Sequence, residues 1–225
     1  MLILLDSADL NELKTIIPHH PVDGVTTNPT IIGRSCTDRQ EIPGLLQRIR
    51  GLIGDDGMLH IQVTARDFAG IIGEAEAIRE QFGRGVYIKV PVTFEGIKAI
   101  TVLSRQGIAV TATAVFTPQQ ALLAAKAGAD FVAPYVNRLD DLAVDGSQVV
   151  REIKQIFTDY SLKTRVLAAS FKNVEQIHRV CLSGADALTI SPELYEKMLA
   201  HPLTKLSVEG FERDWAALPE ESKGR

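Results

Sequence analysis

The chain reads Val86-Tyr87-Ile88-Lys89-Val90-Pro91 near its middle, and the fold and the chemistry both follow from this stretch. A short apolar run of this kind is typical of a strand that is buried on both faces of a parallel sheet. Lys89 interrupts the run. An ammonium group in a buried strand loses its water shell, which lowers its pKa from about 10.4 towards neutrality. A partly neutral amine is a nucleophile that can form a Schiff base with a carbonyl. A lysine near a strand end whose head reaches solvent is the other interpretation that the stretch alone allows.

The same alternation of a short strand and a helix continues on both sides of this stretch. Glycines at 107, 128 and 184 stand where a helix ends and the next strand begins. The predicted strands are Leu2–Leu5, Val22–Val25, Leu59–Val63, Val86–Val90, Ile108–Thr111, Phe131–Ala133, Arg165–Ala168 and Ala187–Ile190. The predicted helices are Ala8–Ile17, Ile42–Ile53, Ala69–Phe82, Phe94–Arg105, Pro118–Ala127, Gln148–Tyr160, Val174–Leu182 and Pro192–Ala200.

Eight strands that alternate with eight helices predict an α/β protein, a single (β/α)8 TIM barrel. An open, doubly wound sheet is the alternative, but no glycine-rich phosphate motif follows the first strand. Residues 1–201 are predicted to form the barrel catalytic domain, and residues 202–225 a helical arm of that domain. The arm carries an apolar stripe made of Leu203, Leu206, Phe211 and Trp215. Such a stripe is expected to be buried, either on its own barrel or on a neighbouring subunit.

Composition and charge narrow the class of protein. The chain has 225 residues, 45% of them hydrophobic, which suits one large domain with a full core. A formal net charge of −4 with mixed signs predicts no nucleic-acid or membrane partner. Cys36 and Cys181 lie outside any metal-ligand spacing and suit a reducing cytoplasm. Asp6 comes too early for a signal peptide, and no run approaches the roughly 18 apolar residues of a membrane span.

Polar side chains stand at the ends of the predicted strands. They are Asp6, Thr26, Thr27, Asn28, Gln62, Lys89, Thr113, Tyr135, Asn137, Arg138, Ser170, Lys172 and Ser191. Each has an ordinary explanation when taken alone. Asp6 or Ser170 could cap a helix, Gln62 could be a satisfied core amide, and Arg138 could pair with a nearby aspartate. Because barrel enzymes build their sites from the C-terminal ends of several strands, the joint placement around one lysine predicts an active site.

Five motifs, in this order, resemble those of the small transaldolase family and, within it, of the fructose-6-phosphate aldolase branch. They are Asp6, Gly24-Val25-Thr26-Thr27-Asn28-Pro29, Lys89-Val90-Pro91-Val92-Thr93 with Glu95-Gly96, Ala133-Pro134-Tyr135-Val136-Asn137-Arg138, and Ala168-Ala169-Ser170-Phe171-Lys172. The resemblance runs from Met1 to about Trp215. It implies a barrel that performs class I aldol chemistry on sugar phosphates, with no metal and no organic cofactor.

The resemblance also implies a role for each matched residue. Lys89 would form the Schiff base, and Asp6 would move the proton of the substrate hydroxyl. Thr26 and Asn28 would bind the donor portion of the substrate. The phosphate would be held by a guanidinium fork, an ammonium and a hydroxyl, those of Arg138, Lys172 and Ser170.

Two positions separate the branches of the family. Gln62 and Tyr135 resemble the aldolase branch, whereas transaldolases carry Glu and Phe there. Together with Thr113 they would orient a catalytic water. We therefore predict an aldolase that reversibly cleaves fructose 6-phosphate, or a similar ketose phosphate, to dihydroxyacetone and glyceraldehyde 3-phosphate. A transaldolase that transfers the dihydroxyacetone unit is the alternative, and a non-catalytic sugar-phosphate-binding barrel is an alternative of another class.

The chain departs from the aldolase branch at Thr111 and Phe94. If Thr111 faces the donor pocket, its hydroxyl would favour dihydroxyacetone over hydroxyacetone or accommodate a different ketose. The natural sugars are therefore left open. For the C-terminal arm, the resemblance implies a helix that crosses to a neighbouring subunit and builds a homo-pentamer, or a decamer of two rings.

Overall fold

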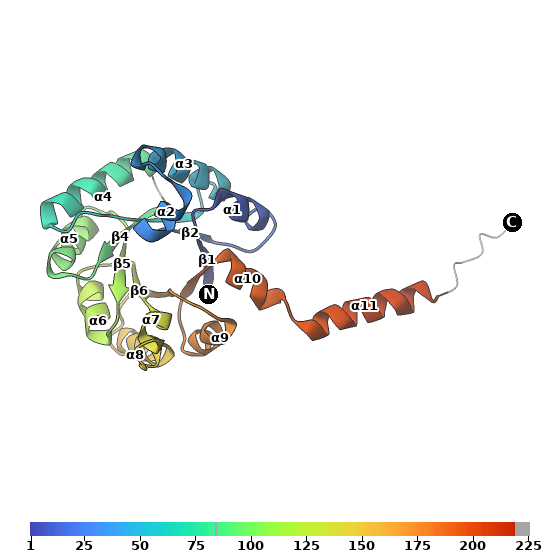
Figure 1. Cartoon of the computed structure of the whole chain (residues 1–225). Helices are drawn as coiled ribbons and strands as arrows, with labels where there is room; N and C mark the ends of the chain where they lie inside the picture. Colours follow the sequence, from blue (N-terminus) through green and yellow to red (C-terminus); the bar gives the residue numbers. More distant parts are fainter. Residues whose placement is uncertain (84, 219–225) are drawn as a thin grey trace.

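Eight parallel strands close into a barrel in the order of the sequence, β1 to β8, in the computed structural model, which describes residues 1–83 and 85–218 (Figure 1). The strands are β1 (Leu2–Asp6), β2 (Gly24–Thr26), β3 (Met58–Gln62), β4 (Val86–Pro91), β5 (Val110–Val115), β6 (Phe131–Pro134), β7 (Arg165–Ala168) and β8 (Ala187–Ile190). Helices surround the strands in Figure 1. The predicted (β/α)8 barrel is confirmed, and the open doubly wound sheet is excluded.

The helices of the ring are α1 (Leu10–Ile16), α3 (Ile42–Ile53), α4 (Phe68–Phe82), α5 (Phe94–Arg105), α6 (Pro118–Lys126), α8 (Gly146–Asp159), α9 (Val174–Leu182) and α10 (Pro192–Leu199). Short segments that the periodicity did not predict are α2 (Pro29–Ser35), the 3-10 turn η1 (Arg39–Glu41) and α7 (Val136–Asp140). Segments of this length carry too few turns to show a period. Both α2 and α7 begin within a site motif, so they place its last residues.

The predicted bounds of β5 are wrong, because the strand begins at Val110 and not at Ile108. Gly107 has a positive φ of 72° and ends α5, and the Ile108 N–H still bonds back to the carbonyl of Leu103 at 3.0 Å. The helix therefore closes with two residues that the apolar pattern alone assigns to the strand. The second strand is shifted in the same direction and runs from Gly24 to Thr26.

A bulge interrupts the pairing of β5 with β6. The register shifts between Ala112 and Val115, and Ala114 has a φ of 57°, in the left-handed region. A bulge of this kind re-aims side chains at the end of a strand. Here Ala114 lines the cavity described below while Thr113 also faces inward.

The inside of the barrel is filled in layers. At the N-terminal end the core consists of Leu4, Phe131, Leu167 and Ala187, all buried. Above it His60 stacks on Tyr87, with ring centroids 4.6 Å apart, and bonds through Nδ1 to the Thr111 hydroxyl at 2.9 Å. In the strand register Lys89 pairs with Gln62 on one side and with Thr111 on the other. Lys89 therefore stands on a packed floor.

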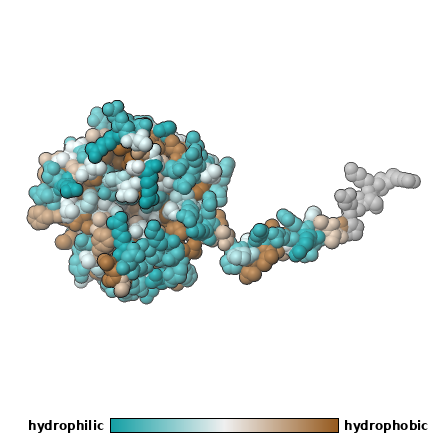
Figure 2. All heavy atoms as spheres, in the orientation of Figure 1, coloured by the Kyte–Doolittle hydropathy of each residue, from teal (hydrophilic) through white to brown (hydrophobic). Residues whose placement is uncertain are grey.

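The C-terminal segment forms α11 (Pro202–Ala216), which projects away from the barrel in Figure 1. None of its described residues is buried, and the predicted stripe is exposed, with Trp215 at 77%. Figure 2 shows hydrophobic side chains along it. The alternative in which this helix folds back on its own barrel is wrong for the structure. Within the described residues, no helix is both long enough and apolar enough to cross a membrane.

Candidate active site

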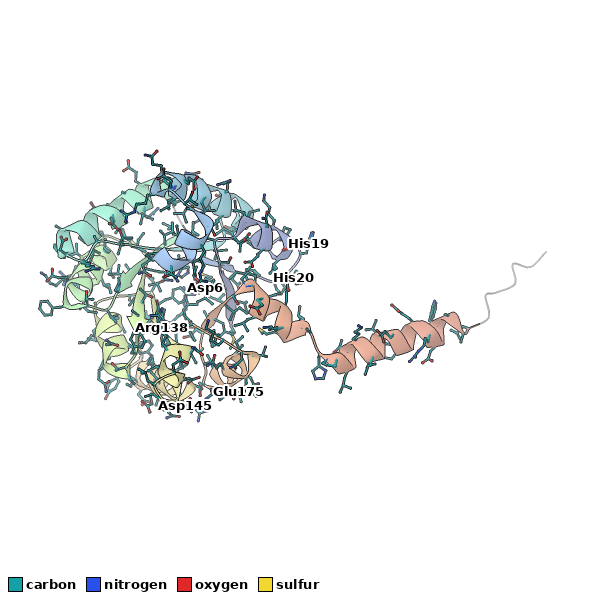
Figure 3. The ribbon with its side chains drawn as sticks, in the orientation of Figure 1. Asp6, His19, His20, Arg138, Asp145 and Glu175 are labelled. Carbon is teal, nitrogen blue, oxygen red and sulfur yellow. The ribbon has the colours of Figure 1, made fainter. Side chains whose placement is uncertain are left out.

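A cavity of about 580 Å³ opens at the C-terminal ends of the strands. Ten of the predicted residues were given a catalytic or substrate-binding role, and eight of these line the cavity: Asp6, Asn28, Gln62, Lys89, Tyr135, Arg138, Ser170 and Lys172. The other two, Thr26 and Thr113, lie behind the wall and bond to residues that line it. Figure 3 shows Asp6 and Arg138 inside the ring of helices, on different sides of the barrel mouth. The structure thus brings all ten predicted residues to one place.

Lys89 lies at the floor of this cavity and is only 4% exposed. Its Nζ donates a hydrogen bond to the carbonyl of Thr27 at 2.8 Å. Burial lowers the pKa of Lys89 below its ordinary value, and the nearby Asp6 carboxylate counteracts part of this shift. The interpretation of a lysine that reaches solvent is therefore wrong, and the amine is held where its neutral form is favoured.

Asp6 ends β1 and faces the same cavity. Burial raises the pKa of its carboxyl group, although the charge of Lys89 and the hydrogen bond from Thr26 act in the opposite direction. The Thr26 hydroxyl donates to Oδ1 of Asp6 at 2.6 Å and contacts the Thr189 hydroxyl at 2.5 Å. Because Thr26 donates to the carboxylate, Thr189 is the donor in the second bond. Asp6 is not a helix cap, since Asp9 caps α1.

Gln62 and Tyr135 approach the cavity from β3 and from the end of β6. The Tyr135 hydroxyl and the Thr113 hydroxyl are 2.9 Å apart. Oε1 of Gln62 is buried and finds no hydrogen-bond partner in the described part of the chain. A buried amide oxygen without a partner is costly, so Gln62 is not a satisfied core amide. The oxygen is available to a water or to a substrate group.

Three groups suited to an anion also line the cavity. Arg138 lies on α7, and its guanidinium carbon stands 4.9 Å from the centre of the Tyr135 ring. Ser170 has a φ of 64° and turns the chain after β7 towards the cavity, and Lys172 follows it. Ser170 is not the cap of α9, which is Asn173. The ordinary explanation of Arg138 as an ion-pair partner of Asp140 or Asp141 is wrong within the described residues, where Asp140 pairs with Arg179 instead.

Asn28 both caps α2 and lines the cavity. Its Oδ1 accepts the N–H of Ile31 at 3.0 Å and so caps α2, with Pro29 at the first helical position. The oxygen is used by the helix, and the amide nitrogen remains for the cavity. Among the described residues no group of three potential ligands is placed to hold a metal ion.

Comparison with known proteins identifies the family. The family model described as transaldolase/fructose-6-phosphate aldolase matches residues 3–222. The chain belongs to this family. A probable transaldolase of Nitrosopumilus maritimus is 39% identical over 99% of this chain and 98% of its own length. A probable fructose-6-phosphate aldolase of Streptococcus pneumoniae is 39% identical over 96% of both chains. A probable transaldolase of Aquifex aeolicus is 38% identical over 98% of this chain and 99% of its own.

These relatives make the chain an enzyme of the aldolase type. Both names occur at nearly the same identity, so the overall likeness favours neither of the two activities. The difference between them has to be sought in single residues of the cavity, where Gln62 and Tyr135 stand.

Two residues singled out as departures from the aldolase branch do not face the cavity of this family member. Thr111 is fully buried, and its hydroxyl is bonded to His60 beneath the floor. It therefore forms no wall of a donor pocket. Phe94 is 84% exposed and lines a second hollow outside the barrel mouth. The sequence places Thr111 on a strand and Phe94 at the start of a helix, but it does not give the depth of either side chain relative to the cavity.

Further polar residues line the cavity and were missed by the sequence reasoning: Thr30, Arg34, Thr189, Glu193 and Lys197. Thr189 carries a usable signal, because it lies two residues after an inward-facing alanine in β8 and is the polar member of an apolar strand. Arg34 and Lys197 lie on helices at the rim, and their contribution to the cavity depends on tertiary placement.

Proposed function

We propose that this chain is a class I aldolase that cleaves fructose 6-phosphate, or a similar ketose phosphate, to dihydroxyacetone and glyceraldehyde 3-phosphate. The observation that carries the proposal is Lys89, a buried amine of lowered pKa at the floor of the cavity. Its Nζ adds to the ketone carbon of the substrate, and water leaves to give a protonated imine. The imine accepts the electron pair of the bond between the α and β carbons of the substrate while the hydroxyl on the β carbon loses its proton, so that an aldehyde and an enamine result.

Asp6 takes the proton from the hydroxyl next to the bond that breaks, and returns it in the reverse direction. Support comes from the raised pKa of its carboxyl group, because a base accepts a proton best when its pKa lies close to the working pH. Thr26 holds one carboxylate oxygen, so the other stays free for the substrate. The second oxygen then faces the hydroxyl that loses its proton.

The two ends of the substrate are held by different groups in this proposal. Asn28 donates from its amide nitrogen to the hydroxyls of the dihydroxyacetone portion, since its oxygen already caps α2. The phosphate binds to Arg138, Ser170 and Lys172. A phosphate anchored there fixes the position of the reacting carbon near Lys89, and this positioning increases the rate.

The last steps separate an aldolase from a transaldolase. An aldolase lets water protonate the enamine and then hydrolyse the imine, whereas a transaldolase keeps the enamine until a second aldehyde arrives. The unpartnered Gln62 oxygen and the bonded hydroxyls of Thr113 and Tyr135 suit a group that orients such a water. Transaldolase is the second candidate, because relatives of nearly the same identity carry that name.

For the assembly we propose a homo-pentamer or decamer in which α11 packs on the neighbouring subunit. The exposed apolar residues of α11 support this, because a stripe of this size is costly in water. We further propose a cytoplasmic location, which suits the two free cysteines.

Borohydride trapping tests the chemistry directly. The protein is incubated with dihydroxyacetone, reduced, and weighed intact, and the adduct is then located by peptide mapping. One adduct on Lys89 is expected, and Lys89→Met should abolish both the adduct and the activity. Lys172→Met is the control, because it removes another lysine of the same cavity and should keep the adduct. An adduct that maps to a different lysine would show the mechanism to be wrong.

A further inference from the structure

Gln176 joins the two segments that carry the proposed phosphate ligands. It lies on α9, is only 4% exposed, and uses its amide for three hydrogen bonds. Oε1 accepts the backbone N–H of Lys172 at 2.8 Å. Nε2 donates to Oδ1 of Asn137 at 3.0 Å and to Oδ2 of Asp140 at 2.7 Å. One side chain thus connects the loop after β7 with the short helix α7.

The helix α7 depends on such connections, because it has only five residues and its N-cap Tyr135 makes no side-chain cap bond. At its start two backbone N–H groups, those of Val136 and Asn137, donate to the carbonyls of Ala169 and Ser170 at 2.9 and 2.8 Å. At its end Asp140 is held by Gln176. Arg138 lies between these two attachments.

Other charged and backbone groups support the end of α7. Oδ1 of Asp140 accepts the N–H of Gly146 at 2.9 Å, and Oδ2 also takes Arg179 at 3.2 Å. Arg179 in turn pairs with Asp145 and Glu175, which Figure 3 shows near each other on the α8 and α9 side of the barrel. The Gln176 amide is the buried member of this network, so its loss would leave the groups that it bonds on Lys172, Asn137 and Asp140 without that partner.

We infer that Gln176 is a positioning residue for the phosphate subsite, holding Arg138 on α7 in a fixed relation to Ser170 and Lys172. The inference rests on the phosphate role proposed for those three residues. Gln176 does not line the cavity, so it acts through the segments that it connects. Groups that share one phosphate must keep their relative placement to bind it together. Removal of Gln176 should therefore weaken phosphorylated substrates selectively.

The test compares two acceptor aldehydes in the synthetic direction, glyceraldehyde 3-phosphate and unphosphorylated glyceraldehyde, with dihydroxyacetone as the donor. In Gln176→Leu the KM for the phosphorylated aldehyde should rise about tenfold, which corresponds to the loss of one hydrogen bond to a charged group. The kcat, and the KM for glyceraldehyde, should stay unchanged. An equal change for both aldehydes would overturn the inference, because general damage to the fold acts on both.

Gln120→Leu is the matched control. Gln120 holds the same place at the start of α6, where its Oε1 accepts the N–H of Phe116 at 2.8 Å. Both variants lose a glutamine that bonds the turn before a helix, but the loop at Gln120 carries no proposed phosphate ligand. Gln120→Leu should leave the preference for the phosphorylated aldehyde intact. If it lowers that preference as much as Gln176→Leu does, the inference is wrong.

A rescue experiment covers the case in which Gln176→Leu folds poorly. Gln176→Glu keeps the acceptor for Lys172 but sets a carboxylate against Asp140, and should lose the phosphate preference. Adding Asp140→Asn reverses donor and acceptor across the same contact, so the preference should return in part. No return would overturn the inference. Arg138→Ala distinguishes a failure of the proposed phosphate subsite from a failure of the positioning role. If Arg138→Ala leaves the preference for the phosphorylated aldehyde intact, the phosphate subsite is wrong. If Arg138→Ala lowers that preference but Gln176→Leu leaves it intact, only the positioning role of Gln176 is wrong.

Discussion

Tyr135→Phe is the substitution that tests the branch assignment most sharply, because it removes a single hydroxyl. The phenyl ring stays, and with it the edge contact to Phe116, at 5.6 Å between ring centroids, and the contact to Arg138 at 4.9 Å. What is lost is the 2.9 Å bond to the fully buried Thr113 and the contact to the proposed water. The change is therefore confined to the groups assigned to hydrolysis.

The size of the effect follows from these contacts. An unpaired buried hydroxyl at Thr113 should cost about 1–3 kcal/mol of the free energy of unfolding. Loss of the water contact should raise the barrier to ketone release by a similar amount, roughly tenfold to a hundredfold in rate. Attack of the enamine on an acceptor aldehyde needs no water to protonate the enamine, whereas hydrolysis of the product imine needs water in both reactions. The rate of transfer should therefore fall less than the rate of ketone release.

The assay measures free dihydroxyacetone released from fructose 6-phosphate without an acceptor, and transfer onto erythrose 4-phosphate with one. The wild-type protein should release the free ketone, and Tyr135→Phe should shift the ratio towards transfer. Tyr160→Phe is the control, because Tyr160 is 73% exposed on the outside of the barrel. Equal loss of release and transfer in Tyr135→Phe would refute the role of the hydroxyl. A wild-type protein that transfers without releasing ketone would make transaldolase the correct name.

Three further outcomes are expected. Thr26→Val removes the hydrogen bond that lowers the pKa of the Asp6 carboxyl group, so this pKa should rise. The acid limb of the pH profile of kcat/KM should then move to higher pH, and an unmoved limb would exclude Asp6 as the base. Burial holds the pKa of His60 well below 6.5, so below about pH 6.5 the unfolded chain binds a proton that the folded chain does not bind. The free energy of unfolding should therefore decrease as the pH falls below about 6.5, by up to about 1.4 kcal/mol per pH unit. Urea midpoints compared with those of His60→Phe check this, and parallel pH curves for the two proteins would contradict it. Truncation after His201 should lower the assembly size in sedimentation, and an unchanged size would rule out subunit contacts through α11.

Much of the fold could be predicted from the sequence, because each βαβ unit carries its own signals. β-branched runs, helical periodicity and the glycines after the helices gave the barrel. The bounds of β5 were missed because Ile108 is apolar for a different reason, as the residue that closes α5. The helices α2 and α7 were missed because five to seven residues hold no period. The cap from Asn28 supports α2, and hydrogen bonds to the segment after β7 support α7.

Site residues could be predicted where an ionisable side chain stands in an apolar strand or at its end. Lys89 in an apolar strand and Asp6 at the end of another are costly choices that packing alone does not explain. The depth of a side chain is different, because it depends on register and on what lies beneath. Thr111 has the same inward direction as Lys89, yet it bonds to His60 below the cavity floor. Gln176 has no signal of its own, since its importance comes from two distant segments meeting it.

The burial of Lys89 and Asp6 costs free energy, and the same burial prepares both groups for the proposed chemistry. Burial lowers the pKa of the amine and raises that of the carboxyl, so each resists its charged form, and each partly supports the charge of the other. A pair in this state exchanges protons with a substrate at small cost, which is what imine formation and carbon–carbon cleavage require. In the proposed mechanism, both activities of the family use this pair. The choice between release and transfer would then depend on the neighbours that hold water, so that a few hydroxyl and amide groups would change the product without changing the barrel.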